Sequence, residues 1–330
     1  MDISSQAYED AKNTTNSTEC HLQKSHLAIP VLLGILSVGC LVFNSISLWI
    51  FWFRFKRWNS SIMLQFNLAL VDASILPITP LTVTYFVLDN HWPFGEFLCQ
   101  FQAFMIYTHL YGSIYFLTLI SVHRYQAIVH YNAKSLWRKK TFWKKLIWFF
   151  WALLILQGLP LFFLIKTLDS DGSIRCLTAY QSELSHVFLI CSIVLLLLCF
   201  LLPFCISMAS YVMLGVYIAK ISEGTFRGRV IKTKSIQMII VALVIFAIGF
   251  MPFHVCSPLA TILKHYKMPC KLLHRIEIGY YISFVFTIVN CCLDPVIYNF
   301  ASENFNRCFS KTLRRFFSSK GEKHSSENVW

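Results

Sequence analysis

The sequence predicts an all-α membrane protein, a bundle of seven membrane-spanning helices followed by an amphipathic eighth helix. Seven long apolar stretches, a low content of charged residues and basic clusters between those stretches support this prediction. Of the 330 residues, 56% are hydrophobic and only 14% are charged, whereas a soluble domain usually has about 25% charged residues. The deficit is typical of a protein whose solvent is mostly lipid.

Each of the seven stretches is long enough to cross the hydrocarbon core as a helix, which takes about 20 apolar residues. Backbone groups in lipid have no water to bond, so only helices or closed barrels span it. A barrel would need alternating apolar and polar residues, and the sequence does not alternate within its apolar runs. The expected spans are Leu27 to Phe53, Ile62 to Leu88, Phe97 to Val129, Leu146 to Ile165, His186 to Ile218, Ile236 to Leu263 and Ile276 to Phe300.

Most of the 29 Lys and Arg lie at or after the ends of the first, third, fifth and seventh spans. The positive-inside rule makes that side cytoplasmic, so the N-terminus is expected outside. Glycosylation acceptor triplets at Asn13 and Asn16 agree. Residues 1–27 lack the apolar region of a signal peptide, so the first helix is expected to direct insertion. Short basic clusters between apolar runs disfavour nucleic-acid binding, the usual alternative for a net charge of +13.

Four segments are therefore expected: an extracellular glycosylated N-terminus at 1–26, a membrane domain at 27–300, an amphipathic cytoplasmic helix at 301–317 and a disordered cytoplasmic tail at 318–330. The amphipathic helix is expected to lie on the inner leaflet, and Cys308 within it is a candidate for palmitoylation. No internal repeat suggests the duplicated halves of a transporter. The apolar residues on one face of this helix are Phe305, Phe309, Leu313 and Phe316.

Polar side chains within the spans are functional candidates because burying them in lipid is costly. Two carboxylates can coexist there if they share a cation or a proton, or if water reaches them. A site for a sodium ion and water is one interpretation, and a protonated, hydrogen-bonded Asp is the other. The residues concerned are Asp72 in the second span, Ser113 in the third, and Asn290 and Asp294 in the seventh.

Arg124 closes the cytoplasmic end of the third span. An Arg there is either an anchor whose charge reaches the interface or a charged latch that changes partners when the bundle opens. Prolines mark the helices that are expected to bend, because each removes a backbone hydrogen bond. They are Pro77 and Pro80 in the second span, Pro203 in the fifth, Pro252 in the sixth and Pro295 in the seventh.

Taken in order, these residues resemble rhodopsin-like (class A) G-protein-coupled receptors from the first to the eighth helix. The runs Trp92–Gly95, Leu110–Ile114, Ile120–Tyr125 and Met251–His254, together with Asp294, look most like the branch of purinergic nucleotide, hydroxycarboxylic-acid and lysophospholipid receptors. The other matching residues are Asn44, the run Leu68–Asp72, Trp151, Pro203 with Tyr211, Phe246 with Phe250–Pro252, and Asp294–Tyr298.

Departures from the family pattern reduce the number of ligand classes that fit the sequence. Nucleotide receptors usually have a basic residue where this chain has Ser257 and an Arg where it has Phe284, and both would pair with phosphate. Ile106 stands where amine receptors have an Asp. His123 stands just before Arg124, where the family usually has an acidic residue, so an ionic lock through that position is lost. Phe250 stands where the family commonly has a Trp.

The resemblance implies a plasma-membrane receptor, without enzymatic activity or an obligatory cofactor, that activates a heterotrimeric G protein. The switch residues it implies are Arg124, Tyr211, Phe246, Phe250, Pro252, Asp294 and Tyr298.

Of the 12 Cys, four are expected on the extracellular side. Four cysteines can pair as two disulfides in three ways. A zinc site is disfavoured because metal-ligand spacing is missing. The resemblance selects Cys99 with Cys176, and Cys20 with Cys270.

Basic residues around the third outer loop, together with Arg175, predict a vestibule that attracts an anionic ligand; the alternative is an ordinary solvated surface. A small anionic metabolite or lipid acid is the preferred ligand. A nucleotide held by non-standard cations is the alternative, and a transporter or channel is disfavoured. The candidate ligand contacts are Tyr107, Tyr111, Arg175, His254, Arg275, Tyr280 and Tyr281.

Overall fold

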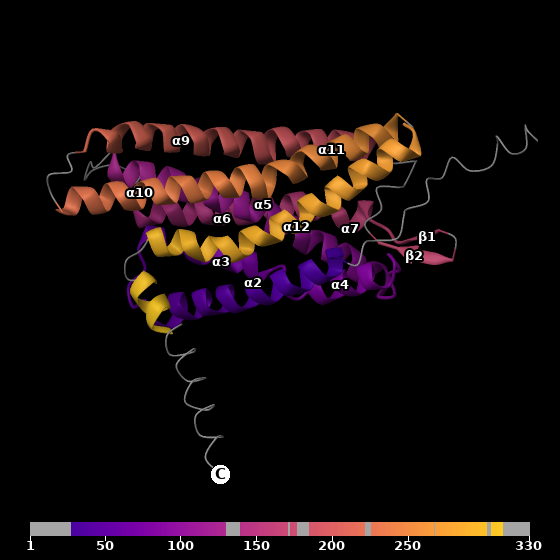
Figure 1. Ribbon diagram of the computed structural model, residues 1–330, viewed down its shortest axis with the longest axis horizontal. Coiled ribbons are helices and arrows are strands. Elements are labelled where there is room, and N and C mark those ends of the chain that lie inside the picture. The colour runs from indigo at the N-terminus through magenta and orange to yellow at the C-terminus, as the bar shows by residue number, and fades with distance from the viewer. Residues whose placement is uncertain are drawn as a thin grey trace, which may run out of the picture.

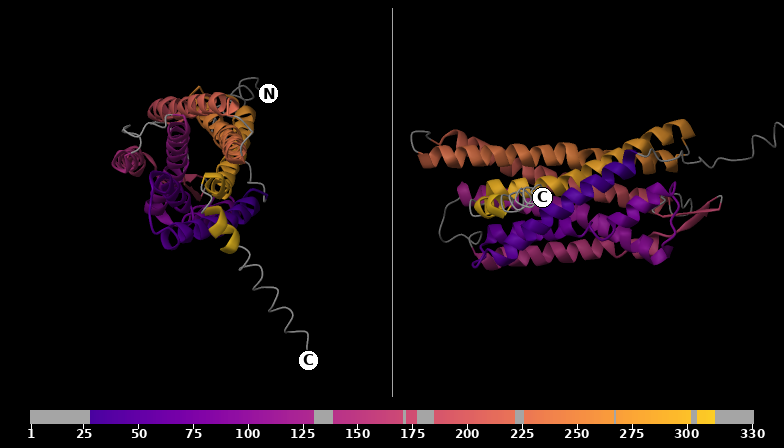
Figure 2. Two further views of the ribbon diagram at one scale, coloured as in Figure 1. Left: turned by 90° about the vertical axis from the view of Figure 1, so that its left-hand side faces the viewer. Right: turned by 60° about the horizontal axis from the view of Figure 1, so that its bottom comes forward.

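Long helices that run side by side make up almost all of the described chain (Figure 1), and an end-on view shows them grouped in one bundle (Figure 2). The computed structural model describes residues 28–129, 139–170, 172–176, 185–221, 226–266, 268–301 and 305–312. The first half contains α2 (Ala28–Phe53), α3 (Ser60–Ala73), α4 (Thr79–Val87), α5 (Gly95–Ile128), α6 (Lys140–Gly158), α7 (Leu161–Leu164), and strands β1 (Leu168–Ser170) and β2 (Ser173–Arg175). The second half contains α8 (Ser185–Val194), η3 (Leu195–Leu201), α9 (Leu202–Ala219), α10 (Phe226–Val244), η4 (Ile245–Phe250), α11 (Met251–His265) and α12 (Cys270–Ala301).

Six continuous helical segments of the described chain are long and apolar enough to cross a membrane. The span expected from Ile62 to Leu88 is divided in the structure, because α3 ends at Ala73 and α4 begins at Thr79. Pro77 and Pro80 explain the break, since a proline cannot donate the helical hydrogen bond and is tolerated in a first turn. Together α3 and α4 form the remaining span, and the predicted all-α seven-span bundle is confirmed.

Besides α12, which begins at Cys270 where Ile276 was expected, two other helices begin earlier than the hydropathy pattern predicted. The sixth span was expected from Ile236, yet α10 begins at Phe226. The fourth was expected from Leu146, yet α6 begins at Lys140. Both extensions contain Lys or Arg, which are good helix formers but lower the local hydropathy. The helices therefore continue past the apolar region, where a hydropathy criterion ends.

The fifth and sixth spans each widen into a π-helical turn just before a proline. The segment η3 ends two residues before Pro203, and η4 ends two residues before Pro252. A proline inside a helix removes one hydrogen bond and crowds a carbonyl of the preceding turn. A wider turn accommodates that carbonyl, and such π-turns often occur at functional positions. Both spans are thus locally irregular at the prolines that were expected to bend them.

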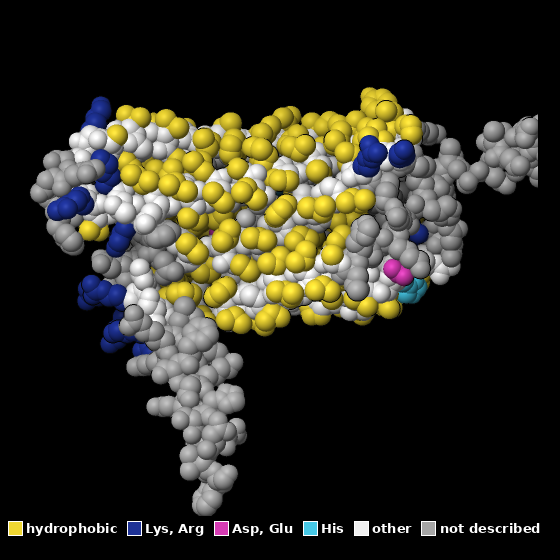
Figure 3. Space-filling view, in the orientation of Figure 1, with side chains coloured by type: hydrophobic (Ala, Val, Ile, Leu, Met, Phe, Trp, Pro, Cys, Tyr) yellow, Lys and Arg dark blue, Asp and Glu magenta, His cyan; other side chains and the backbone are white. Residues whose placement is uncertain are grey.

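The helix α5 lies at the centre of the bundle, where it packs against α3, α6 and α9. Most of its residues are buried, whereas the other spans expose much of their apolar surface. Figure 3 shows hydrophobic side chains covering the flank of the bundle and Lys and Arg gathered mainly at one end. Exposed apolar side chains such as Trp148, at 74%, and Phe163, at 79%, fit a surface that faces lipid.

A short helix over residues 305–312 follows α12. Phe305 and Phe309 are buried, and the Phe305 ring lies 5.0 Å from that of Phe51 and 5.6 Å from that of Tyr298. Lys311 on the same helix is exposed and Cys308 is half-buried. The described part has the expected apolar and basic faces; Leu313, Phe316 and the tail lie outside the described residues.

Candidate functional site

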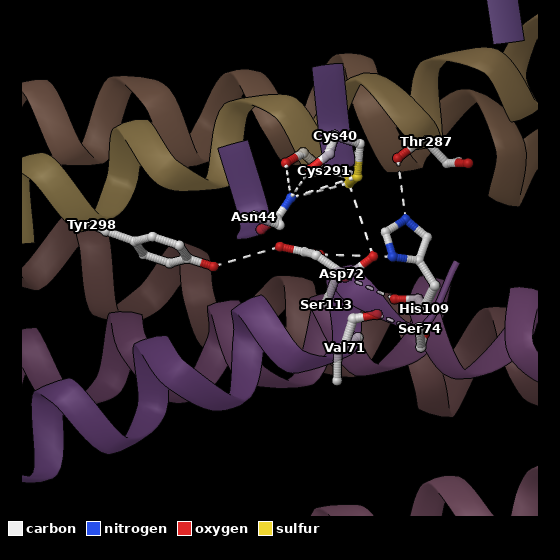
Figure 4. Close-up of polar contacts among 10 residues, drawn as sticks. All are labelled: Cys40, Asn44, Val71, Asp72, Ser74, His109, Ser113, Thr287, Cys291 and Tyr298. Atoms are coloured by element: carbon white, nitrogen blue, oxygen red, sulfur yellow. Dashed lines mark hydrogen bonds and ion pairs between the residues drawn. A yellow bond between two sulfur atoms is a disulfide. The ribbon is translucent and has the colours of Figure 1, made fainter. Parts of the chain in front are cut away.

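Asp72 on α3 is fully buried at the middle of the bundle, where three helices meet (Figure 4). Ser113 on α5 donates a hydrogen bond of 3.1 Å to one carboxyl oxygen of Asp72. The Tyr298 hydroxyl on α12 donates one of 3.5 Å to the other oxygen. Tyr298, a predicted switch residue, therefore contacts Asp72 in this conformation.

Asp294 on α12 is also fully buried, near enough to Asp72 for the two carboxyl groups to interact electrostatically. Neither Asp294 oxygen accepts a hydrogen bond from a donor among the described side chains and backbone. Two adjacent carboxyl groups in a buried site repel each other unless they share a proton or a cation. The structure thus brings together Asp72, Ser113 and Asp294, three of the four residues predicted to bind sodium.

Asn290, the fourth, lies one turn before Asp294 and packs against Gly249 of η4. A Cβ atom at Gly249 would collide with the Asn290 amide, so only glycine allows this close approach of η4 to α12. The Asn290 amide nitrogen is buried and has no hydrogen-bond partner in the described chain. Its contact with the sixth span connects the carboxyl pair to a helix with predicted switch residues.

His109 joins this cluster, although it was not among the predicted site residues. Its Nδ1 lies 3.7 Å from the Asp72 oxygen that also accepts from Ser113. Its Nε2 lies 3.5 Å from the backbone carbonyl of Thr287 on α12. His109 is four residues before Ser113, so the two share one face of α5. That spacing was the signal in the sequence that could have found it.

Asn44 ties α2 to α12 beside the carboxyl pair. Its amide donates to the backbone carbonyl of Cys291 at 2.8 Å and to that of Cys40 at 3.1 Å. The sulfur atoms of Cys40 and Cys291 touch in the same place. Asn44 also appears in the family resemblance, and its bonds show how it fixes the first span against the seventh.

The five aromatic residues predicted to contact a ligand belong to one chain of rings across the bundle. Successive ring centroids lie 5–6 Å apart, distances typical of favourable aromatic pairs. His254 stacks on Phe200 with centroids 4.1 Å apart and donates from Nδ1 to the Phe250 carbonyl at 2.9 Å. Its buried Nε2 has no partner in the described chain. The chain runs Tyr107–Tyr111–His254–Phe253–Tyr280–Tyr281.

Arg175 ends β2, next to Cys176, at the end of the bundle where the β1–β2 hairpin lies. A disulfide of 2.05 Å joins Cys176 to Cys99 in the first turns of α5, the pairing that the resemblance implies. The backbone N–H of Trp92 also donates to the carbonyl of Ile174 at 2.7 Å. Arg175 is half-buried, and its Nε has no hydrogen-bond partner in the described chain. The backbone on both sides of Arg175 is thus anchored, and one donor of its guanidinium is unused.

Three of the predicted switch residues, Arg124, Tyr211 and Phe246, lie on three different helical elements. Tyr211 is buried on α9, within electrostatic reach of Arg124 on α5. The His123 ring packs 4.9 Å from the buried Trp143 ring of α6. Phe246 is buried between Phe204 and Phe250, with centroid distances of 5.8 and 5.9 Å. His123 thus supports a neighbouring helix, while Arg124 faces Tyr211.

The remaining predicted site residues lie either outside the described residues or apart from the clusters above. Asn13, Asn16 and Cys20 lie outside the described residues, and the side chain of Cys270 is not described. The pairing of Cys20 with Cys270 therefore stays a prediction. Arg275 near the start of α12 is exposed to solvent, in contrast to Arg175. Pro252 is half-buried at the start of α11.

Comparison with known proteins gives consistent matches along most of the chain. Residues 43–298 match the family described as "7 transmembrane receptor (rhodopsin family)". The Y-type purinoceptor 2 of Homo sapiens is 33% identical over 283 residues, 86% of this chain and 75% of that protein. The Y-type purinoceptor 4 of Rattus norvegicus is 30% identical, with 87% and 80% covered. The Y-type purinoceptor 1 of Meleagris gallopavo is 28% identical, with 95% and 86% covered.

Proposed function

Because the chain belongs to the rhodopsin family of seven-transmembrane receptors, we propose that it binds a small anionic metabolite or a lipid acid at its outer end. The family match and the similar purinoceptors identify the chain as a G-protein-coupled receptor of the purinergic branch. Such a receptor is a multi-pass protein of the plasma membrane and not an enzyme. This leaves little support for a transporter or channel. The chemistry of the ligand is the part that the residues of this chain must decide.

The orientation that this function needs puts the β1–β2 hairpin outside the cell and the 305–312 helix inside. Basic side chains gathered at the end with that helix support this orientation (Figure 3). The segments at 1–26 and 318–330 would then be an extracellular glycosylated N-terminus and a cytoplasmic tail.

An N-terminal epitope tag is expected to react with antibody on intact cells, because an odd number of spans separates the two termini. A C-terminal tag should react only after permeabilisation. Labelling of both tags on intact cells would contradict this topology. Loss of a mass shift with glycosidase in an Asn13→Gln, Asn16→Gln variant would identify the glycosylated side independently.

The observation that best supports an anionic ligand is the half-buried Arg175, whose backbone neighbours are tied down and whose Nε has no hydrogen-bond partner in the described chain. A guanidinium presents a planar fork of N–H groups that matches a carboxylate or phosphate. Leaving such a donor without a partner costs free energy, which a bound acid would recover. Arg275 is exposed and so resembles an ordinary surface charge.

The distance between Arg175 and the aromatic rings favours an elongated acid. Arg175 adjoins the disulfide at Cys99, and Tyr107 follows eight residues later on α5. At 1.5 Å per residue, the two levels are about 12 Å apart along the helix. A ligand could therefore place its acid group at Arg175 and its apolar body among the tyrosines and His254.

The names of the relatives favour the alternative, a nucleotide receptor. Against it, the positions of two expected phosphate-binding cations hold Ser257 and Phe284. Phe284 is only 9% exposed, and its ring lies 6.5 Å from that of Phe253. This apolar contact provides no partner for phosphate, so a nucleotide would need Arg175 or other cations.

Replacing Arg175 with Ala is expected to lower the potency of an anionic agonist by about 10- to 100-fold. The reason is that one hydrogen bond to a charged group contributes about 1.5–3 kcal/mol, and each 1.4 kcal/mol is tenfold in affinity. The measurement is a second-messenger dose response to a panel of carboxylic acids and acidic lipids, with surface expression matched. Arg175→Lys should recover only part of the loss.

Lys166→Ala, which removes an exposed charge at the same end of the bundle, is the matched control, and Arg275→Ala tests the other candidate. Unchanged potency of every anionic agonist in Arg175→Ala and Arg275→Ala would reject the proposal. Nucleoside di- and triphosphates belong in the same panel. A response to them that Arg175→Ala abolishes would favour the nucleotide alternative, and flat curves would exclude it.

A further inference from the structure

Two histidines meet where the fifth span begins and the sixth span ends. His186 lies in the first turn of α8, and His265 is the last residue of α11. Their ring centroids are 4.3 Å apart, and the ring planes are inclined at 69°. His186 is exposed and His265 is half-buried, so solvent reaches the pair. Neither histidine belongs to the candidate ligand contacts or to the switch residues.

A second contact between the same two helices lies deeper in the bundle. The hydroxyl oxygens of Ser192 on α8 and Thr261 on α11 are 3.5 Å apart. Ser192 follows His186 along the chain, and Thr261 precedes His265 by one turn, so this contact is about 6–9 Å further in at 1.5 Å per residue. The helices α8 and α11 also pack directly against each other. The approach of the two rings therefore belongs to a packed pair of helices.

Two imidazoles on neighbouring helices have the chemistry of a transition-metal site. Imidazole nitrogen binds zinc at about 2 Å, and imidazole suits zinc better than it suits magnesium or calcium. On one tetrahedral zinc ion, two imidazole centroids are about 5 Å apart. The two rings, at 4.3 Å, need only a small change of position to reach that geometry. The exposed side chain of His186 has room to make it.

We propose that His186 and His265 together bind a zinc ion, with water in the remaining coordination positions. The described residues contain no group of three or more His, Cys, Asp or Glu that could hold a metal ion. A site with two protein ligands binds zinc reversibly, unlike a structural site, which has four. The site uses no cysteine and is therefore distinct from the cysteine zinc site that the sequence disfavours.

A zinc ion at this position would join the fifth span to the sixth. These are the two spans that widen into a π-helical turn before Pro203 and Pro252, so the ion would hold together two helices that are irregular further in. The placement of the ion on the extracellular side rests on the orientation proposed above. The binding itself does not, because it depends only on the contact between α8 and α11.

The test is the rate at which diethyl pyrocarbonate modifies each histidine of the purified full-length receptor, measured by mass spectrometry. The reagent attacks the nitrogen lone pair that zinc would occupy. At zinc chloride ten times the dissociation constant, modification of His186 and His265 should slow about tenfold, with one common half-maximal concentration. Magnesium chloride should protect neither. His91, whose Nδ1 accepts from the Ile174 backbone N–H at 3.3 Å, is the internal control and should react equally in all three conditions.

Substitutions at His265 show whether the two rings share one ion. In His265→Gln, zinc should no longer slow the modification of His186. In His265→Cys, a thiolate replaces the imidazole as a zinc ligand, and the protection of His186 should return. An unchanged rate at His91 shows that each variant is folded.

Protection of His186 that persists in His265→Gln would overturn the proposal, and so would equal rates with and without zinc in the wild type. Neither outcome involves Arg175 or an agonist. Failure of the zinc site would therefore leave the proposed anionic ligand unaffected, and failure of that ligand would leave the zinc site unaffected.

Discussion

An Arg124→Ala receptor is expected to reach the cell surface and to lose agonist-stimulated nucleotide exchange on its G protein, by about 100-fold. Coupling between two sites of a receptor typically amounts to about 1–3 kcal/mol, or 5- to 150-fold. The large expected effect reflects the position of Arg124 at the cytoplasmic end of α5, beside Tyr211 on α9. An agonist far from this end can act only by shifting the balance between conformations.

The neighbours of Arg124 explain why it can change partners. The family pattern implies an acidic residue before the Arg, but here His123 stands there and packs on Trp143. Tyr298 contacts Asp72 in this conformation and is therefore engaged at the centre of the bundle. Movement of Tyr298 away from Asp72 would connect the carboxyl pair to the cytoplasmic end. Phe246 and the irregular turn before Pro252 would allow the sixth span to move with it.

Arg54→Ala provides a matched control for Arg124→Ala. Arg54 follows α2, is exposed, and places its guanidinium 4.9 Å from the centre of the Trp49 ring. Both variants remove one positive charge from a residue next to the membrane, but only Arg124 lies inside the helix bundle. Nucleotide exchange per surface receptor should be close to wild type in Arg54→Ala. Normal exchange in Arg124→Ala would show that Arg124 is only an interfacial anchor.

The number and order of the spans could be predicted from the sequence because lipid allows few alternatives to an apolar helix. The breaks within spans and the extensions of helices beyond their apolar regions were harder to predict. Pro77 and Pro80 were recognised as points of bending, yet whether a helix bends or ends depends on how its neighbours pack. The beginning of α10 at Phe226 was missed because Arg and Lys in its first turns hide a helix from a hydropathy criterion.

Only part of the centre of the candidate site could be predicted from the sequence. Carboxylates within a span are conspicuous, so Asp72 and Asp294 were found directly. His109 was overlooked because a single His among apolar residues is usually structural. Its role depends on the crossing of α3, α5 and α12, which brings Asp72, Ser113 and Thr287 to one point. The four-residue spacing of His109 and Ser113 puts both on one face of α5, but it does not say which residues of α3 and α12 that face meets.

Replacing Cys176 with Ser is expected to remove most of the receptor from the cell surface. The disulfide closes a sequence separation of 77 residues between α5 and β2, and loss of such a bond typically costs about 2–5 kcal/mol. Because β2 positions Arg175 over the outer end of α5, the remaining surface receptor should also lose agonist potency. The measurement combines surface immunolabelling with a dose response normalised to the receptors present.

A double-mutant cycle separates the bond from the two thiols. If Cys99 and Cys176 are bonded, the variant with both changed to Ser should be no worse than Cys176→Ser alone, because either change breaks the same bond. Cys205→Ser, at an exposed free cysteine of α9, should behave like the wild type. Additive losses in the double variant would mean that the two cysteines act separately. The hairpin would then be held near α5 chiefly by the hydrogen bond from the Trp92 backbone N–H to the Ile174 carbonyl, which does not depend on either cysteine.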